Sequence, residues 1–244
     1  MHHFENVPSW TLAIDSISRH RDTGWSADDD CVAPTGHSPD GNETMIINIF
    51  PKPVYSAPSG LAPEYLVQLA EAMEPQYRPR QQASCFWQTE GNLQEQEVFA
   101  PLVELGVERA KAFMSELGFV ETNFYVTQMW GNKYQQKELI PPHVHNNSFL
   151  SGVLYVQFSE GSGNTYFAEQ YDSDLQIEIK QPTIYTVGEQ AVPAKQGDLV
   201  MFRSNIPHSN YPNRHDDDRI TIAFNMMPCE MGRKEKFTYL KWNG

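Results

Sequence analysis

Two histidines separated by one residue lie in the stretch of the sequence best suited to metal chemistry. His143 and His145 belong to residues 141–156, PPHVHNNSFLSGVLYV, where two prolines end the preceding segment and an apolar strand follows. In an extended chain, residues two apart leave the same face, so both imidazoles can bind one metal ion. The alternative is a pair of solvent-exposed histidines at a strand edge, which needs no metal.

A second stretch, residues 196–228, supplies a third histidine and a candidate anion site. It contains GDLVMF, then His208 directly after a proline, then a strand that begins with RIT. In that strand Arg219, Thr221 and Asn225 alternate with apolar residues and therefore share one face. An arginine that points into a barrel is costly unless it meets an anion, so Arg219 and the Thr221 hydroxyl are predicted to hold a carboxylate. The alternative is a solvent-facing strand whose arginine pairs with the preceding loop acids, Asp216, Asp217 or Asp218.

The spacing of these residues resembles that of the 2-oxoglutarate and Fe(II)-dependent oxygenases. His208 follows His145 by 63 positions (208 − 145), and the Arg-x-Thr motif follows His208 by 11 (219 − 208). The sequence is most similar to a group of 2OG-Fe(II) oxygenases in which HxH precedes a Ser-Gly-Val-Tyr type strand, here SGVLYV. The resemblance spans the part of the chain from Phe124 to Pro228.

This resemblance implies a jelly-roll core that binds 2-oxoglutarate as cosubstrate at an Fe(II) centre. The keto acid end of 2-oxoglutarate would chelate the iron, and its distal carboxylate would meet Arg219 and Thr221. Tyr155, on the strand after the histidine pair, and Asn225 are further candidates for this pocket. The implied reaction is hydroxylation of an unidentified small-molecule or protein substrate, with release of succinate and CO₂.

The metal ligands depart from the usual pattern of two histidines and a carboxylate, because His145 stands where the acid is expected. Three arrangements are open. In the first, His143, His145 and His208 all bind the iron. In the second, His143 and His208 bind it, and water takes the position of the missing acid. In the third, His145 is the leading histidine ligand, and Asn147 replaces the carboxylate as a neutral oxygen donor. We adopt the first, and we expect the lost carboxylate to weaken retention of a divalent ion.

Short strands separated by turn residues are predicted around these sites. The runs that indicate strands are 123–130, the region around Val144, 150–158, 164–168, 177–179, 183–187, 198–203 and 219–226. This pattern is typical of an antiparallel sandwich or barrel, so we expect a mainly β fold with flanking helices, a double-stranded β-helix. Helices are predicted from Pro63 to Met73 and from Glu97 to Leu117, with Gly118 as the stop, packed on one outer face of the sheet.

The first 44 residues are expected to be an extension or linker. Residues 27–44, ADDDCVAPTGHSPDGNET, are rich in acids, Pro, Gly and Ser and offer little apolar area to bury. The oxygenase domain is therefore predicted to span residues 45–244, beginning with the apolar run MIINIF and carrying its helices within residues 60–118.

Composition limits the partners and the compartment. Lys and Arg number 18 against 31 Asp and Glu, and a net charge of −13 disfavours nucleic acid and anionic membranes as partners. The three cysteines are widely spaced and odd in number, which favours a reducing compartment, and the chain begins without a secretion signal. We therefore expect a cytoplasmic protein, compatible with a homo-oligomer.

Two other functions fit the same residues. A cupin-like metalloenzyme would use three histidines without 2-oxoglutarate, and a non-catalytic ligand-binding β-barrel would keep the histidines for structure. Arg219 distinguishes the oxygenase from the cupin-like enzyme, because only the oxygenase needs a buried cation to hold a diacid.

Overall fold

Strand β10 (Arg219–Pro228) lies at the centre of the largest sheet in the computed structural model, which describes residues 51–82, 84–168, 178–184, 186–232 and 240–241. It pairs antiparallel with β4 (Phe124–Tyr134) on one side and with β5 (Leu150–Gln157) on the other. Every residue of β10 except Met227 is buried. A strand between two partners has its backbone groups paired in the sheet, so both of its faces can be covered.

Two antiparallel sheets of unequal size confirm the predicted mainly β, jelly-roll class. The main sheet has seven strands in the order β1-β8-β5-β10-β4-β3-β2. Its outer strands are β1 (Val54–Pro58), β2 (Arg78–Gln82), β3 (Ser84–Gln88) and β8 (Asp198–Arg203). The second sheet has the order β7-β6-β9, formed by β6 (Thr165–Ala168), β7 (Glu189–Ala191) and β9 (His208–Asn210). Strands β11 (Glu230–Met231) and β12 (Leu240–Lys241) form a separate pair.

Both predicted helices are confirmed. Helix α1 (Pro63–Met73) has the predicted bounds and begins with proline, whose missing N–H is no loss in the first turn. The 3₁₀ turn η3 (Glu97–Phe99) precedes α2 (Ala100–Glu116), so the α-helical part of the second helix starts later than predicted. Gly118 follows α2 with a φ of 78°, a conformation that favours glycine and ends the helix. Neither described helix is long and apolar enough to cross a membrane.

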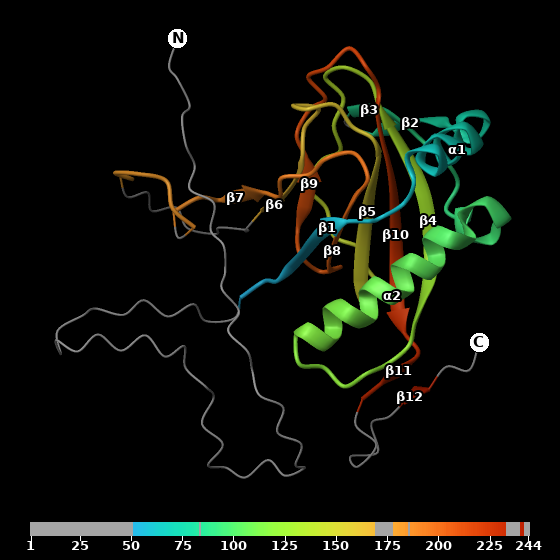
Figure 1. Ribbon diagram of the computed structural model, residues 1–244. Coiled ribbons are helices and arrows are strands. Elements are labelled where there is room, and N and C mark those ends of the chain that lie inside the picture. Colours follow the sequence, from blue (N-terminus) through green and yellow to red (C-terminus); the bar gives the residue numbers. More distant parts are fainter. Residues whose placement is uncertain (1–50, 83, 169–177, 185, 233–239, 242–244) are drawn as a thin grey trace. The chain divides into compact units, whose positions relative to one another are not determined.

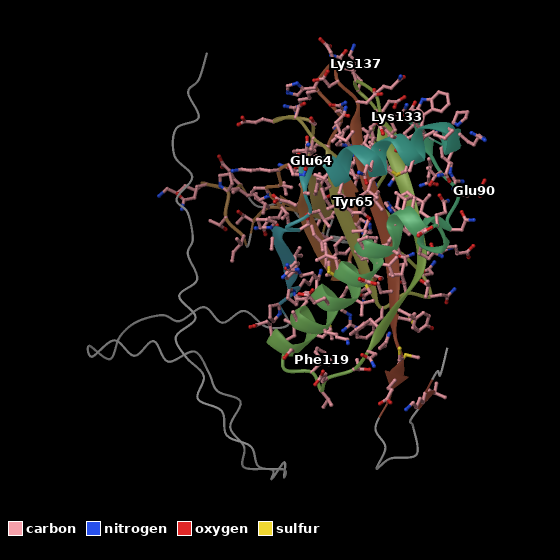
Figure 2. All side chains as sticks on the ribbon, turned by 45° about the vertical axis from the view of Figure 1, so that its right-hand side comes forward. Glu64, Tyr65, Glu90, Phe119, Lys133 and Lys137 are labelled. Atoms are coloured by element: carbon pink, nitrogen blue, oxygen red, sulfur yellow. The ribbon has the colours of Figure 1, made fainter. Side chains whose placement is uncertain are left out.

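The helices cover one face of the main sheet, as Figure 1 shows for α2 against β5, β10 and β4. Tyr65 on α1, labelled in Figure 2, donates a hydrogen bond of 2.7 Å to the carbonyl of Val98 in η3. Two further 3₁₀ turns, η1 (Glu74–Gln76) and η2 (Leu93–Glu95), lie in the connections around the helices. The apolar set of β10 belongs to the same buried core as both helices, and consists of Ile220, Ile222, Phe224 and Met226.

Several strand predictions are wrong or lie outside the described residues. Val144 and its neighbours form a single β-bridge, between His143 and His208, instead of a strand. Residues 183, 184, 186 and 187 are not in a strand, because the Thr183 carbonyl accepts from the N–H groups of Thr186 and Val187, and β7 follows them. Residues 178 and 179 are not in a strand. Residue 177, the run 45–50 and the predicted extension 1–44 lie outside the described residues, so the domain boundary at residue 45 stays a prediction.

Gly152 explains why the SGVLYV motif carries a glycine in the middle of a buried strand. It lies opposite Phe224 in the pairing of β5 with β10. A Cβ atom at this position would lie 2.3 Å from the Phe224 ring, which is fully buried in the core. The ring therefore occupies the space that any other side chain would need.

We predict that Gly152→Ala lowers the free energy of unfolding by about 1–3 kcal/mol, because the buried Phe224 ring must shift. Gly91→Ala is the matched control, since its Cβ would meet its nearest neighbour, Gln128, at an ordinary 3.7 Å. Urea unfolding of both variants measures the difference. Equal stability of the two variants would contradict the assigned role of Phe224.

Candidate metal centre and anion site

Main-chain hydrogen bonds hold the HxH segment against the start of β9. The N–H groups of His143 and His208 each donate to the other residue's carbonyl, both at 3.0 Å. The N–H of His145 donates to the carbonyl of Ser204, in the turn between β8 and β9, also at 3.0 Å. Residues 65 (208 − 143) and 59 (204 − 145) positions apart are thus brought together by backbone pairing, as the predicted convergence of the three histidines requires.

The three histidine rings form one cluster. Each offers a ring nitrogen, and these nitrogens all lie within 4.8 Å of one another. The ring centroids of His143 and His208 are 4.4 Å apart, and His145 lies 5.1 Å from His143 and 4.9 Å from His208. Among the described residues, this is the one group of histidine, cysteine and acidic side chains with metal-binding geometry.

Two of the rings have Nδ1 bonded to a main-chain carbonyl. His143 Nδ1 lies 2.9 Å from the Pro141 oxygen, and His208 Nδ1 lies 2.9 Å from the Ile206 oxygen. A carbonyl oxygen can only accept a hydrogen bond, so both Nδ1 atoms carry the proton. Each of these neutral rings therefore has its lone pair on Nε2.

His145 reaches the same state through side chains. Its Nδ1 lies 2.6 Å from Oδ1 of Asn225 and 2.8 Å from Oγ of Ser151. The amide oxygen only accepts, so Nδ1 of His145 is also the donor and Nε2 carries the lone pair. All three rings thus present an unprotonated Nε2.

The separation of the Nε2 atoms fits a shared metal ion. Nε2 of His143 and Nε2 of His145 lie 3.2 Å apart, and two lone pairs at this distance repel each other without a cation between them. Two nitrogen ligands about 2.1 Å from a metal and at right angles to each other are roughly 3.0 Å apart. Imidazole suits iron and other transition metals, so the donor set is chemically competent for the predicted ion.

Burial keeps the three rings neutral. It lowers the pKa of His143 and of His145, and it lowers the pKa of His208 to about 3, helped by the like charge of its two neighbours. His208 is 5% exposed. The rings therefore stay uncharged at neutral pH, which is the protonation state that metal binding requires.

The guanidinium of Arg219 is buried in the same cavity without a partner acid. The side chain is 1% exposed, and the two N–H groups of its Nη1 are shared among three carbonyls: Ser162 at 2.8 Å, Gly163 at 2.7 Å and Tyr211 at 2.9 Å. Its Nη2 has no hydrogen-bond partner in the described part of the chain. The guanidinium also lies 4.2 Å above the Tyr134 ring. Burial lowers the pKa of Arg219, and an anion bound at Nη2 would stabilise the charged form of the guanidinium.

The alternative pairing of Arg219 with the acidic loop is wrong for the described residues. Asp218 lies 4.0 Å from Lys133, and Asp216 accepts a hydrogen bond of 2.8 Å from Gln136. No ion pair among the described residues includes Arg219, and the side chain is turned into the barrel instead of toward solvent. The interpretation of β10 as a solvent-facing strand is therefore also wrong.

The other predicted cosubstrate residues line the cavity in different ways. Thr221 is buried beside Arg219 on β10. The Tyr155 hydroxyl donates to Oγ1 of Thr165 at 2.7 Å and accepts from the Thr165 N–H at 3.0 Å, so its proton is already engaged. Asn225 lies six residues from Arg219 along β10, roughly 20 Å at the rise of a strand, and its oxygen bonds His145. Their contact with 2-oxoglutarate stays a prediction.

The cavity has a volume of about 560 Å³ and lies between the two sheets. Sequence reasoning missed the wall that β4 supplies, because it ended this strand at residue 130. Had the alternation been followed to residue 134, every second residue would have been assigned to the cavity: Gln128, Trp130, Asn132 and Tyr134. Asn147 is exposed and does not line the cavity, so nothing in the geometry supports it as a metal ligand.

Residues 128–225 match the model of a family described as "Putative 2OG-Fe(II) oxygenase". This part of the chain is similar to the 2OG-Fe(II) oxygenases. The matched range contains all of the candidate site residues: His143, His145, Tyr155, His208, Arg219, Thr221 and Asn225. A comparison with curated proteins finds no match.

Several solved structures of oxygenases and related enzymes share the fold. A prolyl-4-hydroxylase from Pseudomonas putida matches with a TM-score of 0.50 and 15% identity, over 71% of this chain and 92% of its own. The α-ketoglutarate-dependent epimerase SnoN from nogalamycin biosynthesis matches with a TM-score of 0.57 and 12% identity, over 73% and 80%. HygX from Streptomyces hygroscopicus, solved with nickel, 2-oxoglutarate and hygromycin B, matches with a TM-score of 0.50 and 12% identity, over 72% and 83%. At these identities the likeness shows the jelly-roll fold.

The buried histidines predict how stability depends on pH in metal-free protein. The folded-state pKa of His208 is about 3 and its unfolded value is 6.5, so the unfolded chain binds more protons between these limits. The free energy of unfolding should therefore fall as pH drops below about 6.5, by up to roughly 1.4 kcal/mol per pH unit for this histidine. Urea unfolding after chelation, at near-neutral and mildly acidic pH, measures the slope.

The control is His208→Asn, which removes the titrating ring. This variant should show a shallower fall in stability over the same pH range. An identical slope in both proteins would contradict the assignment of His208 as a buried neutral histidine.

Proposed function

We propose that this chain is an Fe(II)- and 2-oxoglutarate-dependent oxygenase that hydroxylates an unidentified substrate, releasing succinate and CO₂. The observation that carries the proposal is one cavity with three unprotonated imidazole nitrogens and a buried guanidinium that lacks an acid. When bound, iron and 2-oxoglutarate supply the oxidising power for O₂-dependent hydroxylation of a C–H bond. The protein supplies orientation, charge and exclusion of water.

His143, His145 and His208 would hold the iron, and Arg219 with Thr221 would hold the distal carboxylate of 2-oxoglutarate. The free Nη2 of Arg219 supports this assignment, because a charge-assisted hydrogen bond to a carboxylate satisfies the one unpaired donor. Charge balance supports it as well. Three neutral ligands leave the divalent ion's charge intact, and the cosubstrate brings two negative charges.

The substrate would enter over a polar wall. Gln128 and Glu90 are exposed cavity residues, Gln88 donates to Oδ1 of Asn132 at 2.8 Å, and the Trp130 ring lies 5.5 Å from His145. A polar small molecule or protein side chain fits this wall better than a lipid, and the net charge of −13 disfavours nucleic acid and anionic membranes. We propose a cytoplasmic location from the cysteine pattern, and leave a homo-oligomer open as part of the same proposal.

The cupin-like enzyme and the non-catalytic barrel receive no support from the comparisons or the cavity. An enzyme that ignores 2-oxoglutarate has no use for a guanidinium buried beside the site, and burying it without an anion is costly. A purely structural role does not explain why three rings turn their lone pairs toward one point.

We predict that Arg219→Ala weakens 2-oxoglutarate binding to the Fe(II)-loaded enzyme by about 30-fold or more, since removing one partner of a buried charged pair costs about 2–5 kcal/mol. Arg219→Lys should recover part of the loss, because it keeps the charge without the planar fork. Anaerobic titration and 2-oxoglutarate-dependent succinate formation measure the effect. Arg203→Lys is the control, because Arg203 stacks on Phe149 outside the cavity. Unchanged 2-oxoglutarate affinity and succinate formation in Arg219→Ala would contradict the assignment of Arg219 as the residue that holds the distal carboxylate.

We also predict that His145→Ala lowers affinity for Fe(II) as strongly as His143→Ala does, because both offer Nε2 to the same ion. Asn147→Ala should leave the affinity unchanged, since its side chain is exposed. Iron content after chelation and anaerobic reloading gives the measurement. Full affinity in His145→Ala would support the arrangement in which only His143 and His208 bind the iron. A loss confined to His145→Ala and Asn147→Ala would support the arrangement in which His145 and Asn147 are ligands.

A further inference from the structure

His145 differs from the other two candidate ligands in how its ring is held. His143 and His208 bond main-chain carbonyls, which any sequence provides at these positions. His145 instead depends on two side chains, Asn225 at 2.6 Å and Ser151 at 2.8 Å from Nδ1. These partners come from β10 and β5, so the orientation of this ring is set by residue identity.

We propose that Asn225, with Ser151, is a positioning residue that makes His145 competent as the third metal ligand. Its amide oxygen holds the imidazole in the tautomer and orientation that offer Nε2 to the ion. The inference rests on the proposed metal site, and it reassigns Asn225 from the cosubstrate pocket to the histidine end of the cavity.

An imidazole in this place needs such a partner, whereas a carboxylate does not. Both oxygens of a carboxylate are acceptors, so either can bind a metal whatever its neighbours are. A neutral imidazole has one lone pair and one N–H, and its proton can sit on either nitrogen. An acceptor at Nδ1 therefore decides whether Nε2 is available, and such partners also raise the basicity of the ligand.

In the structure the amide oxygen of Asn225, not its nitrogen, faces the ring. Ser151 Oγ donates to Oδ1 of Asn225 at 3.0 Å, and Nδ2 of Asn225 points to Oε1 of Gln128 at 3.5 Å. Ser151 Oγ also lies 2.9 Å from Ser204 Oγ, where either hydroxyl could be the donor, and Ser204 Oγ lies 2.9 Å from Ser148 Oγ. This row of hydroxyls is buried at Ser151 and Ser204, so the orientation of the amide is supported from behind.

The first test reads the tautomer in metal-free, full-length protein. Long-range ¹⁵N–¹H NMR correlations of labelled histidine should show His145 protonated at Nδ1. In Asn225→Val the proton should move, at least in part, to Nε2, while His143 and His208 keep their tautomers. An Nε2-protonated His145 in the unmutated protein, or an unchanged tautomer in Asn225→Val, would overturn the proposal.

The second test measures affinity for Co²⁺ by competition with a chelator at mildly alkaline pH. Asn225→Val should bind Co²⁺ about tenfold to a hundredfold more weakly, which is the usual loss when the outer partner of a metal-bound histidine is removed. Asn225→Asp keeps the shape and gives the ring a stronger acceptor, so it should bind Co²⁺ more tightly than the unmutated protein by about tenfold.

The matched control is Asn132→Asp, because Asn132 is equally buried in the same cavity and bonds Gln88 instead of a histidine. It should change Co²⁺ affinity by much less than Asn225→Asp. Equal gains in Co²⁺ affinity in Asn225→Asp and Asn132→Asp would show a general charge effect and overturn the proposal. A Co²⁺ affinity in Asn225→Val equal to that of the unmutated protein would overturn it as well. Absence of Co²⁺ binding by the unmutated protein would instead count against the proposed function, and the tautomer measurement would still decide the role of Asn225.

Discussion

The buried guanidinium of Arg219 is the constraint around which one end of the cavity is organised. A cation in this place needs acceptors, and three main-chain carbonyls from two separate loops are turned inward to Nη1. Gly163 supplies one of them with a φ of 88°, and a Cβ there would lie 2.3 Å from the Tyr211 oxygen. Only glycine allows both loops to approach the guanidinium this closely. The close approach of the two loops therefore provides the acceptors that the cation needs.

Strand β10 carries both Arg219 and Asn225, so the proposed 2-oxoglutarate site and the proposed metal site are linked by one strand. Arg219 and Asn225 are on the cavity face of β10, while Ile222 and Phe224 between them pack on the helices. Because the side chains of a strand alternate strictly, a shift by one residue would bury the arginine in the apolar core. The Phe224 ring on β10 fills the space beside Gly152 on β5, where no other side chain fits. This packing opposes such a shift.

How much could be read from the sequence depends on whether the determining contacts are local. The alternation of β10 and the glycine after α2 are local patterns, and both were predicted. Strand β2 (RPRQQ) is rich in arginine and glutamine, and β3 (SCFWQ) is short and shows no alternation of apolar and polar residues, so both were missed. The partners of His145 are 80 and 6 residues away, and the loop acids beside Arg219 suggested a local ion pair that the fold does not form. Long-range pairing decided these features.

Replacing a carboxylate by His145 changes more than one ligand under the proposed function. The first shell loses a negative charge, so the divalent ion is held by neutral nitrogens in a cavity that also contains a guanidinium. Two positive centres in one buried space repel each other, and screening is weak there. A diacid that bridges them removes the repulsion at both ends. Binding of the metal and of 2-oxoglutarate is therefore expected to be mutually reinforcing, since each relieves the charge that opposes the other.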